Sequence, residues 1–328
     1  MKKAYFLISV SNRRNLDLCV KYALAGFMNN ISGVWTFEEI QVGDFISFLY
    51  GAKAHNLYEV TRKEAIKGAE SLPPWQPITF QQSGRTYYFP FRLYLKPVRK
   101  FEEPLVRAEF AYVAENLLLR GGYRRTHFQT DQTTLQAVSQ MGNLWEEYVS
   151  PLDLSNYETF TPHFTKNRDT ILIPEVFQFH EFILQSLVRQ YLCDNENLAR
   201  FLLEVGIAQA SAEIFEVLGE KAFPEGHVDI LLKEATPIGV TRKIIIEVKT
   251  GVAMRQDLNQ LKAYTEEIGD ECIAAILIAR DFSPSIIKMA KDKQIKLASY
   301  VLKQLSDPVA SHTFEGLLQD LILKTVQT

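Results

Sequence analysis

Two carboxylates and an amine lie close together in the sequence, and their types suit chemistry on a phosphate. Asp229 interrupts the apolar run of residues 228–232, and Glu247 ends a run of isoleucines that leads to Lys249. Magnesium and manganese prefer oxygen ligands such as carboxylates. A lysine beside the metal could orient the attacking water or stabilise charge on the phosphate. This combination predicts an enzyme that cuts nucleic acid with a divalent metal ion.

Two neighbouring strands would bring these three side chains together. Residues 243–248 are rich in β-branched side chains and follow the turn-forming run 236–239, a pattern that predicts a strand. Because side chains alternate across a strand, Glu247 and Lys249 share one face. The apolar run in front of Glu247 is typical of a central strand buried on both faces. A charge is unfavourable there unless it is paired or bound to a metal.

The pattern of Asp229 followed by Glu247-Val248-Lys249 resembles the Asp…Glu-x-Lys core of the PD-(D/E)XK nuclease superfamily. The resemblance implies a restriction-endonuclease-like α/β/α sandwich with a mixed sheet. It also implies that Asp229, Glu247 and the Val248 carbonyl bind Mg²⁺ or Mn²⁺, with Lys249 as a catalytic residue. The Pro-Asp pair of the family name is absent, because the nearest proline is Pro224. Without the resemblance, a Glu-x-Lys on a strand would be interpreted as a solvated edge pair.

Two helices around this core could add polar groups. Gln260 and Tyr264 resemble the Gln-x-x-x-Tyr helix of the RecB-like branch of the superfamily. Residues four apart share a helix face, so both could point at one phosphate as catalytic residues. Residues 174–192 have apolar side chains near helical spacing and predict a second helix. In related nucleases a glutamate on this helix approaches the metal, which favours Glu181, with His180 as a weaker candidate; a solvated glutamate is the alternative.

The rest of this half alternates strands with helices, as an α/β/α sandwich requires. The pattern predicts strands at residues 272–279 and 295–300, and helices at residues 283–293 and 314–326. We therefore assign residues 174–328 to a nuclease domain.

Length and composition leave room for a second domain. The 328 residues suffice for two domains of ordinary size, and a 47% share of hydrophobic residues can form real cores. The three cysteines are scattered without metal-ligand spacing, which favours a reducing cytoplasm and argues against zinc sites and disulfides. No apolar stretch is long enough to span a membrane. We expect a recognition domain at residues 1–145 and a linker at residues 146–173.

Net charge differs between the two halves of the chain. Residues 1–150 contain 18 Lys and Arg against 14 Asp and Glu, whereas the remaining residues contain 18 against 25. A phosphate backbone is therefore expected to bind to the basic half. The imbalance is modest, so it only supports the other arguments for nucleic acid.

The first half is predicted to be mostly β-structure, folded as a small curved sheet or barrel. Strands are expected at residues 5–10, 42–51, 57–60 and 87–95, and helices at residues 15–26 and 105–119. Several short motifs resemble the PUA-like superfamily, in particular its EVE and YTH branches. These motifs are Ser9-Val10-Ser11-Asn12, Gly33-Val34-Trp35, Val42-Gly43-Asp44 with Ile46 and Phe48, and the Tyr-Tyr-Phe-Pro-Phe-Arg run at residues 87–92. The resemblance implies a PUA-like β-barrel with flanking helices.

The PUA-like resemblance implies a pocket that takes a flipped, modified base between aromatic side chains. An extruded base needs stacking surfaces, and a methyl group on it favours an apolar cage. Trp75 lies in a proline-rich stretch that predicts a rigid surface loop. Burial in the barrel core is the alternative for these aromatic residues. The candidates are Trp35 and Trp75 as walls, Tyr50 and Tyr87 to close the cage, and Ser9 or Asn12 to hydrogen-bond the base edge.

A basic segment at residues 120–129 combines a Gly-Gly pair with three arginines and aromatic residues. Arginines suit phosphate, so this segment predicts a DNA-contacting loop in which Arg120, Arg124 and Arg125 bind the backbone. A helix C-cap followed by an ordinary basic loop is the alternative.

Taken together, these features predict a modification-dependent DNA endonuclease that resembles type IV restriction enzymes. The first domain would read a flipped methylated or hydroxymethylated base in double-stranded DNA. The second would cut by metal-activated water, in defence against foreign DNA. One active site cuts one strand, so a double-strand break would require a homodimer or a transient pair. A repair or mismatch nuclease and a non-catalytic DNA- or RNA-binding protein are the alternatives.

Overall fold

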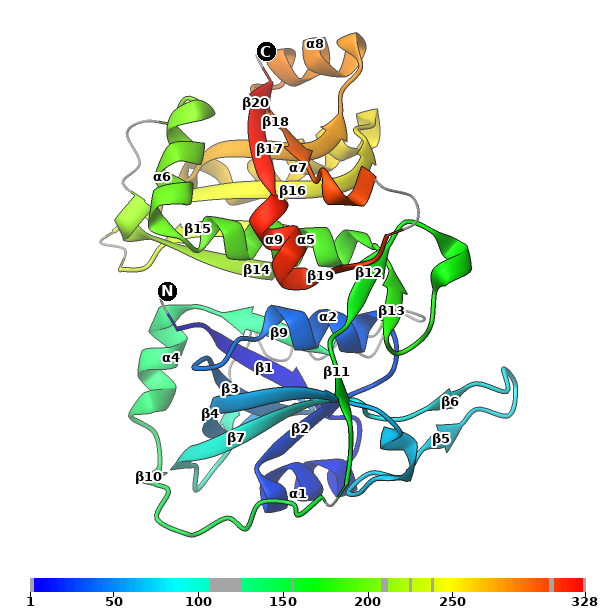
Figure 1. Ribbon diagram of the computed structural model, residues 1–328. Coiled ribbons are helices and arrows are strands. Elements are labelled where there is room, and N and C mark those ends of the chain that lie inside the picture. Colours follow the sequence, from blue (N-terminus) through cyan, green and yellow to red (C-terminus); the bar gives the residue numbers. More distant parts are fainter. Residues whose placement is uncertain are drawn as a thin grey trace. The chain divides into compact units, whose positions relative to one another are not determined.

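The computed structural model describes residues 3–106, 126–154, 156–207, 212–223, 226–236, 239–306 and 310–326 (Figure 1). The chain divides into two compact units. The N-terminal unit comprises Lys3–His163 and Asp169–Phe177, and the C-terminal unit comprises Phe164–Arg168 and the chain from Gln178 onward. No helix within the described residues is long and apolar enough to cross a membrane.

The N-terminal unit is built on one mixed sheet with the strand order β10-β7-β4-β3-β1-β9. These strands are β1 (Tyr5–Ser9), β3 (Phe45–Tyr50), β4 (Lys53–Ile66), β7 (Phe91–Lys100), β9 (His127–Thr130) and β10 (Asn143–Leu144). β1 and β3 are parallel, and the other neighbours are antiparallel. Among the described residues the path runs from β10 to β9 without joining, so the predicted closed β-barrel is not found. The strands at its two ends are short, which leaves little backbone to close the sheet.

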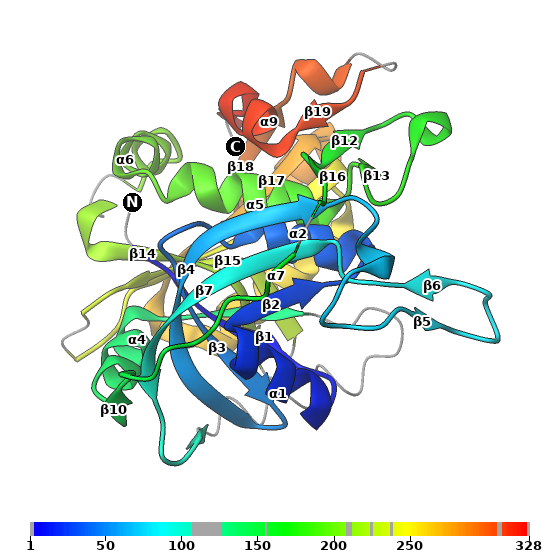
Figure 2. The same ribbon diagram turned by 60° about the horizontal axis from the view of Figure 1, so that its bottom comes forward.

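Within the described residues, further strands and three helices surround this sheet (Figure 2). They are β2 (Leu24–Phe27) on β7, β8 (Leu105–Val106) and β11 (Thr159–Phe160) on β4, the separate hairpin of β5 (Ile78–Thr79) and β6 (Thr86–Tyr87), and the helices α1 (Arg13–Tyr22), α2 (Ile31–Glu39) and α4 (Gln132–Ser139). The helix predicted at residues 15–26 is too long, because Ala23 adopts a left-handed backbone (φ 44°) and the next residues pair with β7. The helix predicted at residues 105–119 is wrong at its start, where β8 lies; residues 107–119 lie outside the described residues.

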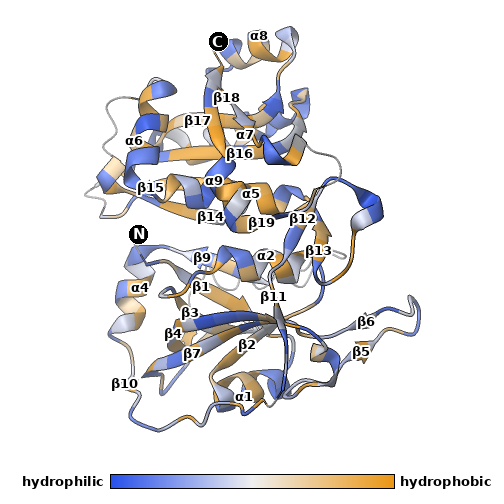
Figure 3. Ribbon diagram, viewed as in Figure 1, coloured by the Kyte–Doolittle hydropathy of each residue, from blue (hydrophilic) through white to orange (hydrophobic). Residues whose placement is uncertain are grey.

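The C-terminal unit contains a mixed six-stranded sheet with the order β14-β15-β16-β17-β18-β20, which confirms the predicted mixed sheet. Its strands are β14 (Phe215–Phe223), β15 (Gly226–Glu234), β16 (Lys243–Val252), β17 (Cys272–Asp281), β18 (Lys296–Val301) and β20 (Ile322–Val326). The central strands β16 and β17 are strongly hydrophobic, as Figure 3 shows. Their isoleucine- and alanine-rich segments are buried on both faces, as expected for parallel strands between helices.

Helices cover both faces of the C-terminal sheet (Figure 1). They are α5 (Glu181–Leu192), α6 (Asn195–Glu204), α7 (Arg255–Ile268), α8 (Pro284–Asp292) and α9 (Phe314–Asp320). Leu258 of α7 and Ile286 of α8 pack into one core with Ile245 of β16 and Leu277 of β17. Helix α5 lies against the sheet in the other layer.

Two predicted helices of this half are corrected by the structure. The helix expected at residues 314–326 is α9 followed by β20, because Leu321 is extended and the last strand pairs with the free edge of β18. The helix expected at residues 174–192 starts later: β13 (Val176–Gln178) precedes it, and α5 begins at Glu181. Strand β13 belongs to a small sheet with β12 (His163–Thr165) and β19 (His312–Thr313).

Candidate active site

The two candidate metal-binding carboxylates lie where β15 and β16 separate. Regular pairing of these antiparallel strands ends at Ile230 and Ile246. Just beyond, Asp229 takes the place of a backbone partner, because its Oδ2 accepts the N–H of Val248 at 2.8 Å. The same register, continued by one residue, sets Asp229 opposite Glu247. Both acids therefore lie side by side where the pairing of β15 and β16 ends, within neighbouring strands as the sequence predicts.

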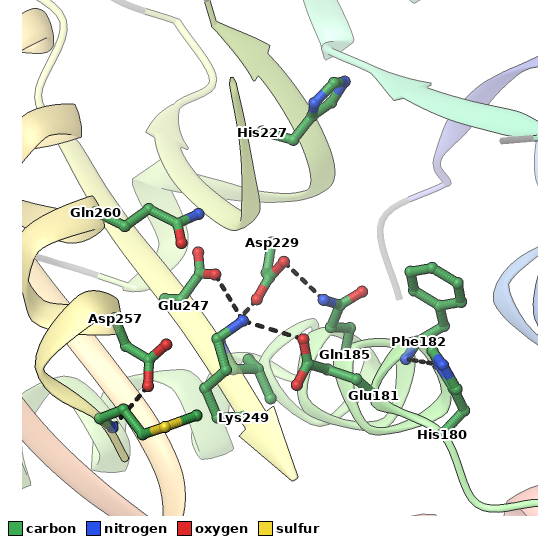
Figure 4. Close-up of polar contacts among 12 residues, drawn as sticks. His180, Glu181, Phe182, Gln185, His227, Asp229, Glu247, Lys249, Asp257 and Gln260 are labelled. Carbon is green, nitrogen blue, oxygen red and sulfur yellow. Dashed lines mark hydrogen bonds and ion pairs between the residues drawn. The ribbon is translucent and has the colours of Figure 1, made fainter. Parts of the chain in front are cut away.

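Lys249 connects carboxylates from two elements (Figure 4). Its Nζ lies 2.9 Å from Oε1 of Glu247 and 3.0 Å from Oε1 of Glu181, the first residue of α5. The Glu247 side chain is only 2% exposed, and its Oε2 is a buried atom without a hydrogen-bond partner among the residues that the structure describes. A buried carboxylate oxygen is unfavourable unless a donor or cation meets it. The cluster thus contains one acceptor whose requirement the protein leaves unmet.

Burial and neighbouring charges shift the two titratable groups at the centre of the cluster. Burial raises the pKa of Glu247 well above its usual range, and the Asp229 carboxylate adds to this effect, while Lys249 opposes it. Burial alone would lower the pKa of Lys249, but the carboxylates around it prevail and raise that pKa. The lysine is therefore a stable cation at neutral pH, whereas Glu247 holds a proton more readily than an exposed glutamate does.

Helix α5 supplies a contact to the acid pair that the sequence analysis missed. Gln185 lies one helical turn after Glu181, so the two side chains share a face. Its Nε2 donates to Oδ1 of Asp229 at 2.6 Å, and the residue is buried. The four-residue spacing from Glu181 is the signal that could have identified it. His180 has a different place: its Nδ1 accepts the N–H of Phe182 and caps the start of α5.

Helix α7 carries Gln260 (Figure 4), and Tyr264 of the same helix braces its side chain. Gln260 Nε2 donates to Tyr264 Oη at 2.9 Å, and that hydroxyl donates to the carbonyl of His227 in β15 at 3.1 Å. Tyr264 is only 4% exposed. It ties α7 to β15, and burial raises its pKa with a contribution from the charges of Glu247 and Asp229, so Tyr264 lies near the acids and Gln260 is bonded to it.

The oxygen atoms at the point where β15 and β16 separate suit a hard divalent cation. Within the described part of the chain, no group of three or more His, Cys, Asp or Glu side chains is arranged as a metal site. The candidate metal ligands are instead two carboxylates. They are Glu247, through its unpartnered Oε2, and Asp229, which lies opposite it. A cation between them would meet the requirement of Glu247 and reduce the repulsion between the two acids. Ligation by the Val248 carbonyl stays a prediction.

Both tryptophans predicted to form a base pocket are buried in the N-terminal unit. Trp35 lies in α2, is 2% exposed, and packs edge-on against the His127 ring with 4.5 Å between centroids. Trp75 is 6% exposed, so its predicted surface position is wrong. Its ring covers Gly26, where an added Cβ would lie 2.4 Å from the ring, and it also contacts Phe89. The absent side chain of Gly26 is what makes room for this burial.

The other four pocket candidates lie on different elements of the same unit. Ser9 ends β1 next to the end of β3, which holds Tyr50, so these two share one edge of the sheet. Asn12 caps α1 by accepting the N–H of Asn15 at 2.8 Å. Tyr87 lies in the β5–β6 hairpin. The predicted phosphate-binding residues Arg120, Arg124 and Arg125 lie outside the described residues.

Neither a protein-family model nor a curated protein matches the chain. Among solved structures, it is similar to an EndoMS–dsDNA2 complex (TM-score 0.22, 25% identity, covering 25% of this chain and 35% of that one). It is also similar to a repair endonuclease from Pyrococcus abyssi (TM-score 0.22, 19% identity, covering 32% and 46%). A third is the DNA modification-dependent restriction endonuclease AspBHI (TM-score 0.21, 10% identity, covering 88% and 66%). The chain thus spans less than half of the first two structures, and scores this low define neither its fold nor its activity.

Proposed function

We propose that this chain is a metal-dependent DNA endonuclease with its active site where β15 and β16 separate. One observation carries the proposal: a buried acid pair with an unpartnered oxygen on Glu247 lies beside Lys249, which two carboxylates hold in place. A cluster that served stability alone would be expected to pair its buried oxygen atoms within the protein. An unmet carboxylate oxygen favours a cation as the missing partner.

The surrounding residues divide the chemical work. Asp229 and Glu247 would hold the cation, which when bound lowers the pKa of a water and stabilises charge on the phosphate. Lys249 stays protonated and offers its positive charge to the scissile phosphate. Gln185 fixes the orientation of the Asp229 carboxylate, and Gln260 offers an amide group to the substrate from α7.

The proposal assigns the choice of substrate to the N-terminal unit. The basic charge of the first half and its resemblance to PUA-like readers support recognition of a flipped methylated or hydroxymethylated base in double-stranded DNA. Because Trp35 and Trp75 are buried, stacking of a base on either ring requires a change in the packing around it. Two chains acting together would make a double-strand break.

Digestion of matched duplexes tests this proposal. Methylated, hydroxymethylated, unmodified and mismatched versions of one DNA are incubated with the protein in Mg²⁺, in Mn²⁺ and in EDTA. We expect metal-dependent cutting of the modified duplexes first. Equal cutting of modified and unmodified DNA overturns the proposal that the N-terminal unit recognises a modified base. Preference for the mismatched duplex identifies a repair nuclease instead. Failure to cut any duplex with either metal overturns the nuclease.

A further inference from the structure

The β5–β6 hairpin projects away from the main sheet of the N-terminal unit (Figure 2). Every residue from 76 to 86 is exposed. The base of the hairpin is fixed by Asn29, whose backbone N–H donates to the Tyr88 carbonyl at 3.0 Å. The Asn29 side chain accepts the Tyr88 N–H at 3.2 Å and donates to the Thr86 carbonyl at 3.3 Å. The hairpin is therefore an anchored ribbon rather than a loose loop.

The two faces of this ribbon differ in chemistry. Ile78 pairs with Tyr87, and the N–H of Phe80 donates to the carbonyl of Arg85 at 3.0 Å. Because side chains alternate, these four residues share one face. Ile78 is 49% exposed and Phe80 54% exposed, and the Phe80 ring is held perpendicular to the Tyr87 ring at 5.3 Å. The ribbon thus presents a fixed aromatic ring, an aliphatic side chain and a cation together.

The opposite face of the ribbon is polar, and its two threonine side chains are hydrogen-bonded to each other. Thr79 and Thr86 lie directly across from each other, and their hydroxyl groups are hydrogen-bonded at 2.9 Å. Substitutions on this face change the hairpin without touching the apolar face, which makes them matched controls.

The charge of the hairpin itself suits a polyanion. Residues 76–87 contain Arg85 and no Asp or Glu. A phosphate backbone would meet no carboxylate along these residues, and the exposed Arg85 at the tip could contact it. Acidic groups act at the base, where burial raises the pKa of Tyr88 and the charges of Glu70 and Glu175 add to this effect.

We propose that the β5–β6 hairpin is a DNA-binding ribbon that enters the minor groove and presses Phe80 against a base step. Two-stranded ribbons fit DNA grooves, and apolar wedges such as Phe and Ile partly unstack bases from the minor-groove side. Ile78 would pack beside the wedge, and Arg85 would bind a phosphate. The choice of DNA as the polyanion rests on the proposed nuclease function. A second copy of this chain is the competing occupant of an exposed apolar ribbon.

Binding of a fluorescein-labelled duplex to the full chain in EDTA tests the ribbon without cleavage. We expect Phe80→Ala to bind about tenfold more weakly, the effect of losing one stacking contact. Arg85→Ala should reduce the slope of log affinity against log salt by about one. The controls Thr79→Ala and Thr86→Ala should bind like the wild type. Because these side chains are exposed, all variants should unfold at the wild-type temperature.

A 2-aminopurine placed in the duplex reports unstacking directly. Its fluorescence should rise with the wild type and with Thr79→Ala, but not with Phe80→Ala. Equal DNA binding and equal fluorescence for Phe80→Ala and Thr79→Ala overturn the inference. It is also overturned if Phe80→Ala abolishes dimer formation in sedimentation and leaves DNA binding unchanged. Ribbon-dependent binding without any cutting overturns the proposed nuclease alone. Cutting by a wild type whose affinity does not depend on Phe80 overturns the ribbon alone.

Discussion

Each unit of this protein contains a lysine surrounded by three carboxylates, and the two clusters behave differently. The C-terminal cluster is Lys249 with Asp229, Glu247 and Glu181, and the N-terminal cluster is Lys63 with Glu38, Glu39 and Asp44. Burial lowers the pKa of Lys63 despite its acidic neighbours, whereas the acids raise the pKa of Lys249 above its usual value.

The groups of the N-terminal cluster are used to hold the fold. Asp44 accepts the N–H groups of Ala4 and Gln41, both at 2.9 Å, and Lys63 donates to the carbonyl of Ile40 at 3.2 Å. In the C-terminal cluster, the lysine instead bridges two carboxylates, Glu247 and Glu181. The same residue types can therefore form a brace or a site. The direction in which the pKa of the lysine is shifted separates the two clusters.

Replacing each lysine should give the largest difference between the two clusters. Lys249→Met should slow DNA cleavage by about 10²–10³-fold, because it removes a positive charge aimed at the phosphate. Lys63→Met should keep the cleavage rate but lower the free energy of unfolding by about 3 kcal/mol, since it leaves a buried acid unpaired. Initial cleavage rates and urea unfolding curves measure the two effects. A Lys63→Met variant that folds normally and cannot cut DNA would contradict this division.

Removing the amide that orients Asp229 should have the next largest effect. Gln185→Ala should raise the Mg²⁺ concentration needed for half-maximal cleavage by about 10–100-fold, the usual effect of losing a group that holds a metal ligand. Gln190→Ala on the same helix is the control. Calorimetric titration with Ca²⁺ gives a second measure of cation affinity without turnover. Unchanged affinity in Gln185→Ala would remove this residue from the site.

The sequence was sufficient to predict the strands of the site and much less of what surrounds them. Asp229 interrupts the apolar run of residues 228–232, and a run of isoleucines leads to Glu247, so these runs identify two buried strands and their acids. The bond from Gln185 to Asp229 joins residues 44 apart, and it depends on which face of α5 packs on the sheet. The spacing places Gln185 on the same helix face as Glu181, but no local pattern says which face of the helix packs on the sheet.

Tertiary pairing also explains the wrong predictions of structure. Residues 322–326 are compatible with a helix by composition, but the free edge of β18 turns them into a strand. Trp75 is buried because Gly26, far away in the sequence, leaves space for its ring. The closed barrel was wrong because the strands at both ends of the sheet are short. Each outcome depends on a partner that lies outside any local window of sequence.

The pH dependence of stability, measured without metal ions, gives a further comparison of the two clusters. Burial raises the pKa values of both Glu247 and Glu38. Each protonated acid therefore contributes stability that is fully present below about pH 4.5 and is lost as pH rises through the folded-state pKa. In EDTA, Glu247→Gln and Glu38→Gln should both gain melting temperature relative to the wild type as pH rises. Added Ca²⁺ should stabilise the wild type and Glu38→Gln but not Glu247→Gln; stabilisation of all three would place the cation elsewhere.

The smallest expected effect comes from an acid of the C-terminal sheet whose carboxylate oxygens both accept hydrogen bonds. Glu234 accepts the Arg242 N–H at 3.1 Å and its Nε at 2.7 Å, and these bonds lower the pKa of Glu234. Its contribution is present above about pH 4.5 and is lost as pH falls through the lowered pKa. Glu234→Gln should lower the free energy of unfolding by less than about 1 kcal/mol at neutral pH. Urea unfolding at neutral and acidic pH measures this, and Ca²⁺ should stabilise the variant as it does the wild type.

The most direct measurement compares DNA cleavage by the wild type, Glu247→Gln and Glu38→Gln, with Mg²⁺ and with EDTA. Both substitutions neutralise a buried glutamate that lies beside a lysine, one in each cluster. We expect the wild type and Glu38→Gln to cut modified duplex DNA in Mg²⁺ only, and Glu247→Gln to cut under neither condition. Cutting by Glu247→Gln at the wild-type rate would contradict the assignment of the active site to the point where β15 and β16 separate.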